Sequence, residues 1–227
     1  MTRSAFVATI DGPAGVGKGT LAKQLASHFD FYYLDSGAVY RAVALKILQE
    51  HIDPGNLPAI IKAAQGVDLE FPAQDDYQAH AQGINIDAAL RSEACSEMAS
   101  RIASFPAVRV EVLELQRSFR RAPGLIGDGR DLGTVVFPDA PAKIFLDASC
   151  EERAQRRYKQ LINQGIGASF DHLFDSIRAR DERDRTRSTS PLVAAEGARV
   201  IDSTELTIEK VFSIATDYIQ QQLSMSK

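Results

Sequence analysis

A glycine-rich turn near the N-terminus constrains this chain more than any other feature. The apolar run Phe6–Ile10 leads directly into the sequence GPAGVGKGT at residues 12–20, and the helix-forming stretch LAKQLASHF follows. Glycines let backbone N–H groups converge on an anion, and a helix start adds unpaired donors and a positive dipole end. The sequence therefore predicts a P-loop of the form G-x-x-x-x-G-K between a strand and a helix.

The loop is predicted to hold the phosphates of a nucleotide. Its nine residues are Gly12, Pro13, Ala14, Gly15, Val16, Gly17, Lys18, Gly19 and Thr20. Lys18 would neutralise charge on the outer phosphates. Gly19 stands where many P-loops place the Mg²⁺-binding Ser or Thr, and the hydroxyl follows one residue later at Thr20. We therefore expect Mg²⁺ to be held mainly by the nucleotide and water, without a direct protein ligand.

Composition narrows the classes of protein that the chain can belong to. Its 227 residues, 44% of them hydrophobic and 25% charged, suffice for one globular core with an inserted subdomain. The net charge of −4 argues against bulk binding to nucleic acid, and no apolar run is long enough to span a bilayer or to act as a signal peptide. Two cysteines are too few for a disulfide framework. We expect a cytoplasmic monomer that acts on small molecules, with no nucleic-acid or membrane partner.

Short apolar runs alternate with helical patterns along the chain. This alternation predicts an α/β fold with a five-stranded parallel sheet flanked by helices. The strand candidates are Ala5–Ile10, Phe31–Leu34, Leu125–Gly127, Lys143–Leu146 and Val200–Ile201. Each is followed by an aspartate at or near its carboxyl end, where a parallel sheet binds its ligands. Of these, Asp128 is a candidate to hold the water shell of Mg²⁺, whereas Asp147 and Asp202 are interpreted as local caps.

About ninety residues separate the second and third strand candidates, too many for one crossover helix. The pattern predicts a helix over 38–49, a loop over 52–59, and short strands at 68–71 and 84–86 around a polar stretch. Helices are expected over 92–104 and 108–121, separated at Pro106.

Two groups of arginines lie on predicted helices. Ser149 and Glu152 form a capping box, and the helix that follows carries Arg153, Arg156 and Arg157 on one face. Three like charges there favour a visiting anion, although pairing with nearby acids or solvation would also explain them.

The second group lies on a helix predicted over 169–187, with Leu173, Phe174 and Ile177 directed towards the core. Arg180, Asp184 and Arg187 share one face of this helix. This arrangement can bind a phosphate, or it can be an intrahelical ladder of salt bridges.

Five segments together resemble the bacterial cytidylate kinase family. They are GPAGVGKGT at 12–20, DSGAVYR at 35–41, DGRDLGTVVFPDA at 128–140, ERAQRR at 152–157 and RDERDRTR at 180–187. The resemblance covers essentially the whole chain, and the second and third segments are the most specific. It implies a P-loop kinase that transfers the γ-phosphoryl group of ATP to CMP or dCMP with the help of Mg²⁺.

The resemblance also implies an organisation of the chain. A single P-loop kinase domain over 1–227 would comprise a core at 1–37, 107–150 and 190–227. A nucleoside-monophosphate region with a small β insertion would occupy 38–106, and a short helical lid 151–168.

Residue roles follow from the same motifs. The resemblance places Ser36 and Arg41 on the nucleoside monophosphate, Ser100 on the cytosine amine side and Arg109 on the phosphate. It places Arg130 on a phosphate, Asp131 on the base, and Arg180, Asp184 and Arg187 on phosphate and sugar. The implied catalytic group is Lys18, Arg130, Arg153 and Arg157. An ionised Asp131 can only accept, so it would favour the N4 amine of cytosine over the carbonyl of uracil.

Other readings of the P-loop remain open. A regulatory GTPase would need a guanine-reading N-K-x-D, which the sequence lacks, and a non-catalytic nucleotide-binding module would not need the arginine helices. The nearest alternative is a P-loop kinase for another acceptor, such as UMP, AMP or shikimate. ADP release measured with each acceptor discriminates among them.

Overall fold

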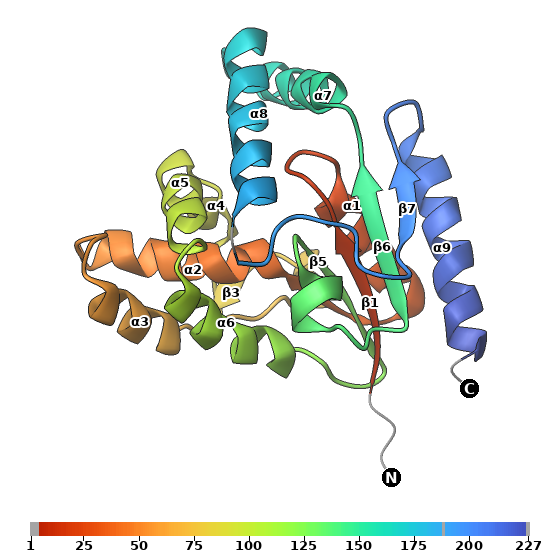
Figure 1. The fold of residues 1–227 in the computed structure, drawn as a ribbon, viewed down its shortest axis with the longest axis horizontal. Helices are drawn as coiled ribbons and strands as arrows, with labels where there is room; N and C mark the ends of the chain where they lie inside the picture. The colour runs from red at the N-terminus through yellow and green to blue at the C-terminus, as the bar shows by residue number, and fades with distance from the viewer. Residues whose placement is uncertain (1–4, 188, 226–227) are drawn as a thin grey trace. The chain divides into compact units, whose positions relative to one another are not determined.

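The computed structural model describes residues 5–187 and 189–225. The described chain has an α/β fold with a five-stranded parallel sheet flanked by helices, in the strand order β2-β5-β1-β6-β7. Figure 1 labels four of these strands, β5, β1, β6 and β7. The strands are β1 Phe6–Asp11, β2 Tyr32–Asp35, β5 Gly124–Gly129, β6 Ala142–Asp147 and β7 Arg199–Asp202. All five predicted strands are thus confirmed, and the predicted fold class with them.

The chain divides into two compact units. The first comprises the N-terminal residues up to Phe6 together with 26–127, and the second comprises 7–25 together with the chain from Asp128 onwards.

In the first unit, helix α2 (Ser36–Gln49) packs against the four other helices (Figure 1). Ile47 of α2 and Ile102 of α5 are among the largest fully buried side chains of this unit. The other helices are α3 Leu57–Gln65, α4 Asp87–Leu90, α5 Glu93–Ile102 and α6 Pro106–Ser118. The predicted helices over 38–49, 92–104 and 108–121 correspond to α2, α5 and α6.

The loop predicted over 52–59 ends earlier than expected, because α3 begins at Leu57. Asn56 caps this helix, with its side chain accepting from the Ala59 N–H at 3.2 Å. Pro58 lies in the first turn, where its missing N–H would have no intrahelical partner in any case.

The small β insertion is real, but its pairing differs from the prediction. The antiparallel hairpin joins β3 (His80–Ala81), within the stretch expected to be polar connection, to β4 (Ile84–Asn85). The predicted strand at 68–71 contributes only a bridge from Glu70 to His80. Polar contacts hold the hairpin, since the Asp75 carboxylate contacts His80 Nε2 at 2.5 Å and accepts from Asn85 Nδ2 at 2.9 Å.

In the second unit, β1, β6 and β7 run parallel, with Ala8 opposite Ala142 and Ile144 opposite Arg199. Helix α9 (Ile208–Met225) packs against β6, and α7 (Cys150–Asn163) lies beside α8 (Phe170–Thr186) (Figure 1). The helix predicted over 169–187 is confirmed as α8. Its residues Leu173, Phe174 and Ile177, predicted to be directed towards the core, are half-buried.

Within residues 5–187 and 189–225, no helix combines the length and apolar character that crossing a membrane requires.

Candidate active site

The phosphate-binding loop follows β1 and leads into α1 (Lys18–Phe29). Gly12, Gly15 and Gly17 have φ of +154°, +76° and +96°, which L side chains rarely adopt. A Cβ at Gly12 would lie 2.0 Å from the Leu146 carbonyl oxygen of β6, so only glycine fits there. Gly19 was predicted to be part of the phosphate-binding loop, but in the structure it lies inside α1 and has helical geometry.

Lys18 is buried at the start of α1, and its Nζ donates to the Pro13 carbonyl at 2.8 Å. Burial and the neighbouring charge of Arg130 hold the pKa of Lys18 well below its ordinary value, with Arg180 acting in the same direction. Asp128 and Asp11 oppose this shift. Three cationic side chains from separate parts of the second unit therefore concentrate positive potential at the loop.

Asp11 fastens the segment after β5 to the end of β1. Its two carboxylate oxygens accept from the Leu132 and Gly133 N–H groups at 2.9 and 2.7 Å, at the start of η2 (Leu132–Val136), a short π-helix. Burial raises the pKa of Asp11 to about 6; the two backbone donors oppose the shift and Asp131 adds to it. Asp11 was not among the predicted site residues, although its place at the end of β1, directly before Gly12, pointed to the site.

Arg130 and Asp184 meet as an ion pair, with Arg130 Nε donating to Asp184 Oδ2 at 2.8 Å. Burial opposes ionisation of Asp184, but Arg130, Arg180 and Arg187 hold its pKa below the ordinary value. The predicted cluster of Arg180, Asp184 and Arg187 is therefore brought together electrostatically. Asp184 pairs with Arg130, outside α8, and the charges of Arg180 and Arg187 also act on its carboxylate. Asp131, beside Arg130 in the chain, is buried.

The three arginines of α7 differ in burial and in partners. Arg153 is 2% exposed and donates to the Ala14 carbonyl of the loop at 2.9 Å and to Asp181 of α8. Arg156 pairs instead with Glu152 at 2.8 Å and with the Ser203 carbonyl at 2.6 Å. Arg157 is exposed and donates to Gln160 Oε1 at 2.8 Å. Pairing with acidic groups, the alternative that the sequence left open, is therefore present at Arg153 and Arg156. Glu152 lies four residues from Arg156, whereas Asp181 lies 28 residues from Arg153.

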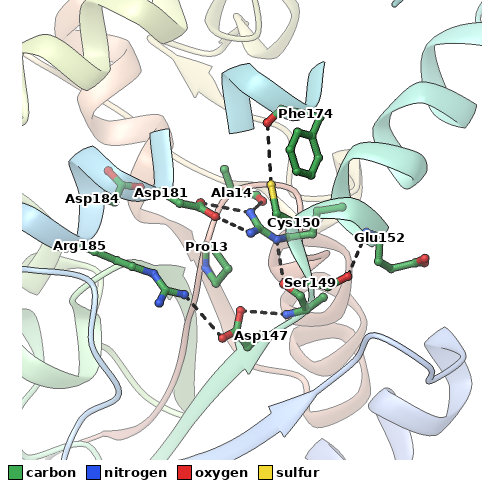
Figure 2. Close-up of polar contacts among 12 residues, drawn as sticks. Pro13, Ala14, Asp147, Ser149, Cys150, Glu152, Phe174, Asp181, Asp184 and Arg185 are labelled. Atoms are coloured by element: carbon green, nitrogen blue, oxygen red, sulfur yellow. Dashed lines mark hydrogen bonds and ion pairs between the residues drawn. The ribbon is translucent and has the colours of Figure 1, made fainter. Parts of the chain in front are cut away.

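The start of α7 confirms half of the predicted capping box. Ser149 Oγ accepts from the Glu152 N–H at 3.1 Å, as Figure 2 shows. The Glu152 side chain pairs with Arg156 and not with the cap. The caps expected at Asp147 and Asp202 are confirmed, since each carboxylate accepts from a backbone N–H within the next two residues.

The remaining predicted site residues lie in the first unit. Ser36 at the start of α2 is buried and accepts from Gln116 Nε2 of α6 at 2.7 Å. Asp35 caps α2 through the Ala38 N–H at 2.8 Å and pairs with Arg41 at 2.6 Å.

Ser100 lies half-buried on α5. Arg109 of α6 donates to the Ala103 carbonyl at 3.2 Å and stands over the Tyr40 ring, 5.7 Å from its centroid.

Taken together, a strand, a glycine loop with positive φ, a buried lysine and a helix start within an α/β sheet define a P-loop nucleotide-binding protein. The family model of cytidylate kinase matches residues 8–221. The chain is 49% identical to the cytidylate kinase of Enterobacter sp. (strain 638) over 227 residues, all of both chains. It is 49% identical over 225 residues to the cytidylate kinase of Pectobacterium atrosepticum, covering 99% of this chain and all of that one.

The fold also resembles the crystal structure of TT1252 from Thermus thermophilus, with a TM-score of 0.50 and 17% identity over 97% of this chain and 99% of that one. The chain belongs to the cytidylate kinase family. Membership confirms the predicted family, the predicted ATP-dependent kinase class and the predicted activity towards CMP or dCMP. The roles of individual residues stay predictions.

Proposed function

We propose that this chain transfers the γ-phosphoryl group of ATP to CMP or dCMP, giving CDP or dCDP and ADP, with the loop at 12–20 holding the donor. Family membership supports the reaction. The observation that carries the residue assignment is Lys18, buried in the glycine loop within electrostatic reach of Arg130 and Arg180. Such a concentration of positive charge suits the phosphates of two nucleotides.

Little covalent help is needed for this chemistry. The transition state of phosphoryl transfer is loose, and its charge is spread over the oxygens of the transferred group. Catalysis is therefore positioning and electrostatic stabilisation by groups already in place. In this proposal the loop amides and Lys18 bind the donor phosphates. Arg130 binds the phosphoryl group that passes from donor to acceptor.

The acceptor is proposed to be bound by nine side chains: Ser36, Arg41, Ser100, Arg109, Arg130, Asp131, Arg180, Asp184 and Arg187. Asp131 would accept from the N4 amine of cytosine. Asp131 is buried, and an ionised carboxylate can only accept, which suits an amine donor such as N4 of cytosine.

The organisation into core, nucleoside-monophosphate region and lid is part of the proposal, with the lid at 151–168. Arg153 and Arg157 would add positive charge at the transferring group, and a closed lid would exclude water that hydrolyses ATP. Gly165 has φ of +74°, and no atom lies within 4 Å of the place that a Cβ would take, so it is suited to act as the hinge.

Mg²⁺ fits the residues present if the nucleotide supplies most of its ligands. Within the described residues, no three His, Cys, Asp or Glu side chains group closely enough to hold a metal. The buried Asp128 carboxylate lies within electrostatic reach of Lys18, where it could accept from the water shell of the ion. When bound, the ion would neutralise charge on the β and γ phosphates.

A cytoplasmic location and a monomeric state complete the proposal. ATP as the donor supports the location, and light scattering of the purified chain tests the oligomeric state.

The deciding experiment is coupled ADP release with CMP, dCMP, UMP, AMP and shikimate as acceptors. CMP or dCMP should give the highest kcat/KM, and Lys18→Ala should lower turnover by several orders of magnitude while the protein stays folded by circular dichroism. Highest activity with shikimate or AMP would overturn the acceptor assignment. Near-normal turnover by Lys18→Ala would overturn the role of the loop.

A further inference from the structure

Arg153, in the first turn of α7, contacts three parts of the second unit at once. Its Nε donates to the Ala148 carbonyl at 3.0 Å, and its Nη1 donates to the Ala14 carbonyl at 2.9 Å. Nη1 and Nη2 also bind the two carboxylate oxygens of Asp181 on α8. Figure 2 shows Asp181 directed from α8 towards Ala14 of the loop. These four bonds use four of the five N–H donors of the guanidinium.

The bond to Ala14 has a consequence for phosphate binding. The peptide between Ala14 and Gly15 is planar, and in a trans peptide the C=O and N–H point in opposite directions. When Arg153 takes the Ala14 oxygen, it therefore fixes the direction of the Gly15 N–H, an amide of the phosphate-binding loop. Arg153 also lies beside Gly15 itself, since a Cβ at Gly15 would be in ordinary van der Waals contact with Arg153 Cβ at 3.7 Å.

Asp181 in turn fixes the orientation of Arg153. The pair is a two-bond contact between a planar guanidinium and a carboxylate, which restricts rotation as well as distance. Both side chains are largely shielded, with 3% of Arg153 and 13% of Asp181 exposed. Asp181 lies one turn before Asp184, so α8 presents one carboxylate to Arg153 beside the loop and one to Arg130.

We propose that Asp181 is a positioning residue for the donor phosphates. It holds Arg153, and through Arg153 it holds the Ala14–Gly15 peptide with its N–H ready for phosphate. Because the same helix carries the Asp184–Arg130 pair, binding of the acceptor at α8 strengthens the binding of ATP at the loop. The coupling to the acceptor rests on the proposed function, whereas the effect of Asp181 on ATP binding does not.

The alternative is an ordinary salt bridge that only joins α7 to α8. That alternative predicts a loss of stability in Asp181 variants without a specific change in ATP binding, because a buried charge left without its partner destabilises any fold. The two roles are separated by measuring ATP affinity well below the melting temperature of each variant.

The test uses Asp181→Asn, which keeps the shape and removes the charge, and Asp175→Asn as a matched control on the exposed side of α8. Titration calorimetry with ATP and Mg²⁺, without acceptor, gives Kd. We expect Asp181→Asn to raise Kd about tenfold or more and Asp175→Asn to leave it within about twofold. With a non-hydrolysable ATP analogue, CMP should tighten binding to the wild type and do so much less for Asp181→Asn.

A second measurement keeps the proposal testable if Asp181→Asn does not fold. Arg153→Lys keeps the charge, but a single ammonium cannot hold Asp181 with two parallel bonds and bind Ala14 in the same geometry. It should raise Kd for ATP to a similar extent. Arg153→Ala and Asp181→Ala should also be non-additive in a double-mutant cycle on Kd.

Wild-type-like ATP affinity in Asp181→Asn, or in Arg153→Lys where the former does not fold, would overturn the positioning role, as would additivity in the cycle. If the wild type fails to phosphorylate CMP, the proposed function fails. The ATP titrations would still decide the role of Asp181, because they contain no acceptor.

Discussion

At the scale of single residues, Arg130 and Asp131 are neighbours in the chain with different proposed tasks. Arg130 is paired with Asp184, in a setting that suits a phosphate contact. Asp131 is buried and carries the proposed base contact. The sequence predicted both residues as part of the site, because DGRDLGTVVFP is a specific motif, but their partners could not be derived from it.

Replacing Asp131 with Asn tests the base contact. Asn keeps the volume and adds an N–H₂ donor that can serve the O4 carbonyl of UMP. Asp131→Asn should lower kcat/KM for CMP about tenfold to a hundredfold, equivalent to about 1.4–2.8 kcal/mol, and affect UMP less. Arg130→Met, the control, should reduce kcat/KM for both nucleotides alike. Equal losses for CMP and UMP in Asp131→Asn would reassign the carboxylate to orienting a neighbouring side chain.

Asp11 gives the protein a pH dependence of stability that can be isolated. Its folded-state pKa of about 6 lies above the ordinary value of 3.8, so between these pH values the folded state binds a proton that the unfolded state has released. The raised pKa of Asp11 therefore contributes fully to the free energy of unfolding below pH 3.8. This contribution, about 3 kcal/mol, is lost as the pH rises to about 6.

Asp11→Asn removes this titration. The free energy of unfolding of the variant minus that of the wild type should rise by up to about 3 kcal/mol between pH 4 and pH 6.5 and then level off. Chemical unfolding at each pH measures the difference, and only its slope is informative, because Asn also loses one of the two backbone contacts. A difference that stays constant across this range would contradict a raised pKa at Asp11.

At the scale of elements, β6 lies so close to the start of the phosphate-binding loop that only glycine fits at position 12. Gly12→Ala would place a methyl group 2.0 Å from the Leu146 carbonyl, which is backbone and cannot rotate away, and φ of +154° is itself strained for alanine. We expect a loss of about 3 kcal/mol or more in the free energy of unfolding.

Gly165→Ala is the matched control, since it also has positive φ but meets no atom within 4 Å. This substitution should lower the free energy of unfolding by only about 1 kcal/mol. Urea unfolding of both variants measures the difference, and equal costs would mean that the approach of β6 to Gly12 is not limiting.

The elements also show where the sequence sufficed and where it did not. The strands could be predicted because short apolar runs with aspartates at their ends have few other structural solutions. The start of helix α3 was missed because it falls within the predicted loop over 52–59, where Pro58 does not reveal the helix: a proline in the first helical turn starts a helix as readily as it breaks one. The hairpin of β3 and β4 was mispaired because its stabilising contacts are polar and carry no hydrophobic alternation.

The residues of the site could be predicted from the sequence, but the contacts between them could not. Lys18, Arg130 and Asp184 were all expected, and the structure brings them together electrostatically. The contacts of Arg153 with Ala14 and Asp181 join segments that lie 139 and 28 residues away, and no local spacing encodes such contacts.

At the scale of the whole molecule, the proposed acceptor residues are divided between the two compact units. Four of them lie in the first unit, and the others, together with the phosphate-binding loop and the proposed lid, lie in the second. Each unit carries residues proposed to bind a nucleotide, so amide exchange in each should fall when its ligand is present, since ordering a segment around a ligand reduces its local opening.

Hydrogen exchange with and without ligands tests this expectation. CMP alone should protect residues 62–104 of the first unit, and a non-hydrolysable ATP analogue with CMP should additionally protect 153–167 of the lid. Helix α9 serves as the internal control, because no residue of it is proposed to touch a nucleotide, and its exchange should change little. Protection confined to one unit would mean that the acceptor contacts are not shared. Identical exchange in all states would argue for a rigid protein and against the lid, because closure requires a segment that opens measurably when the ligands are absent.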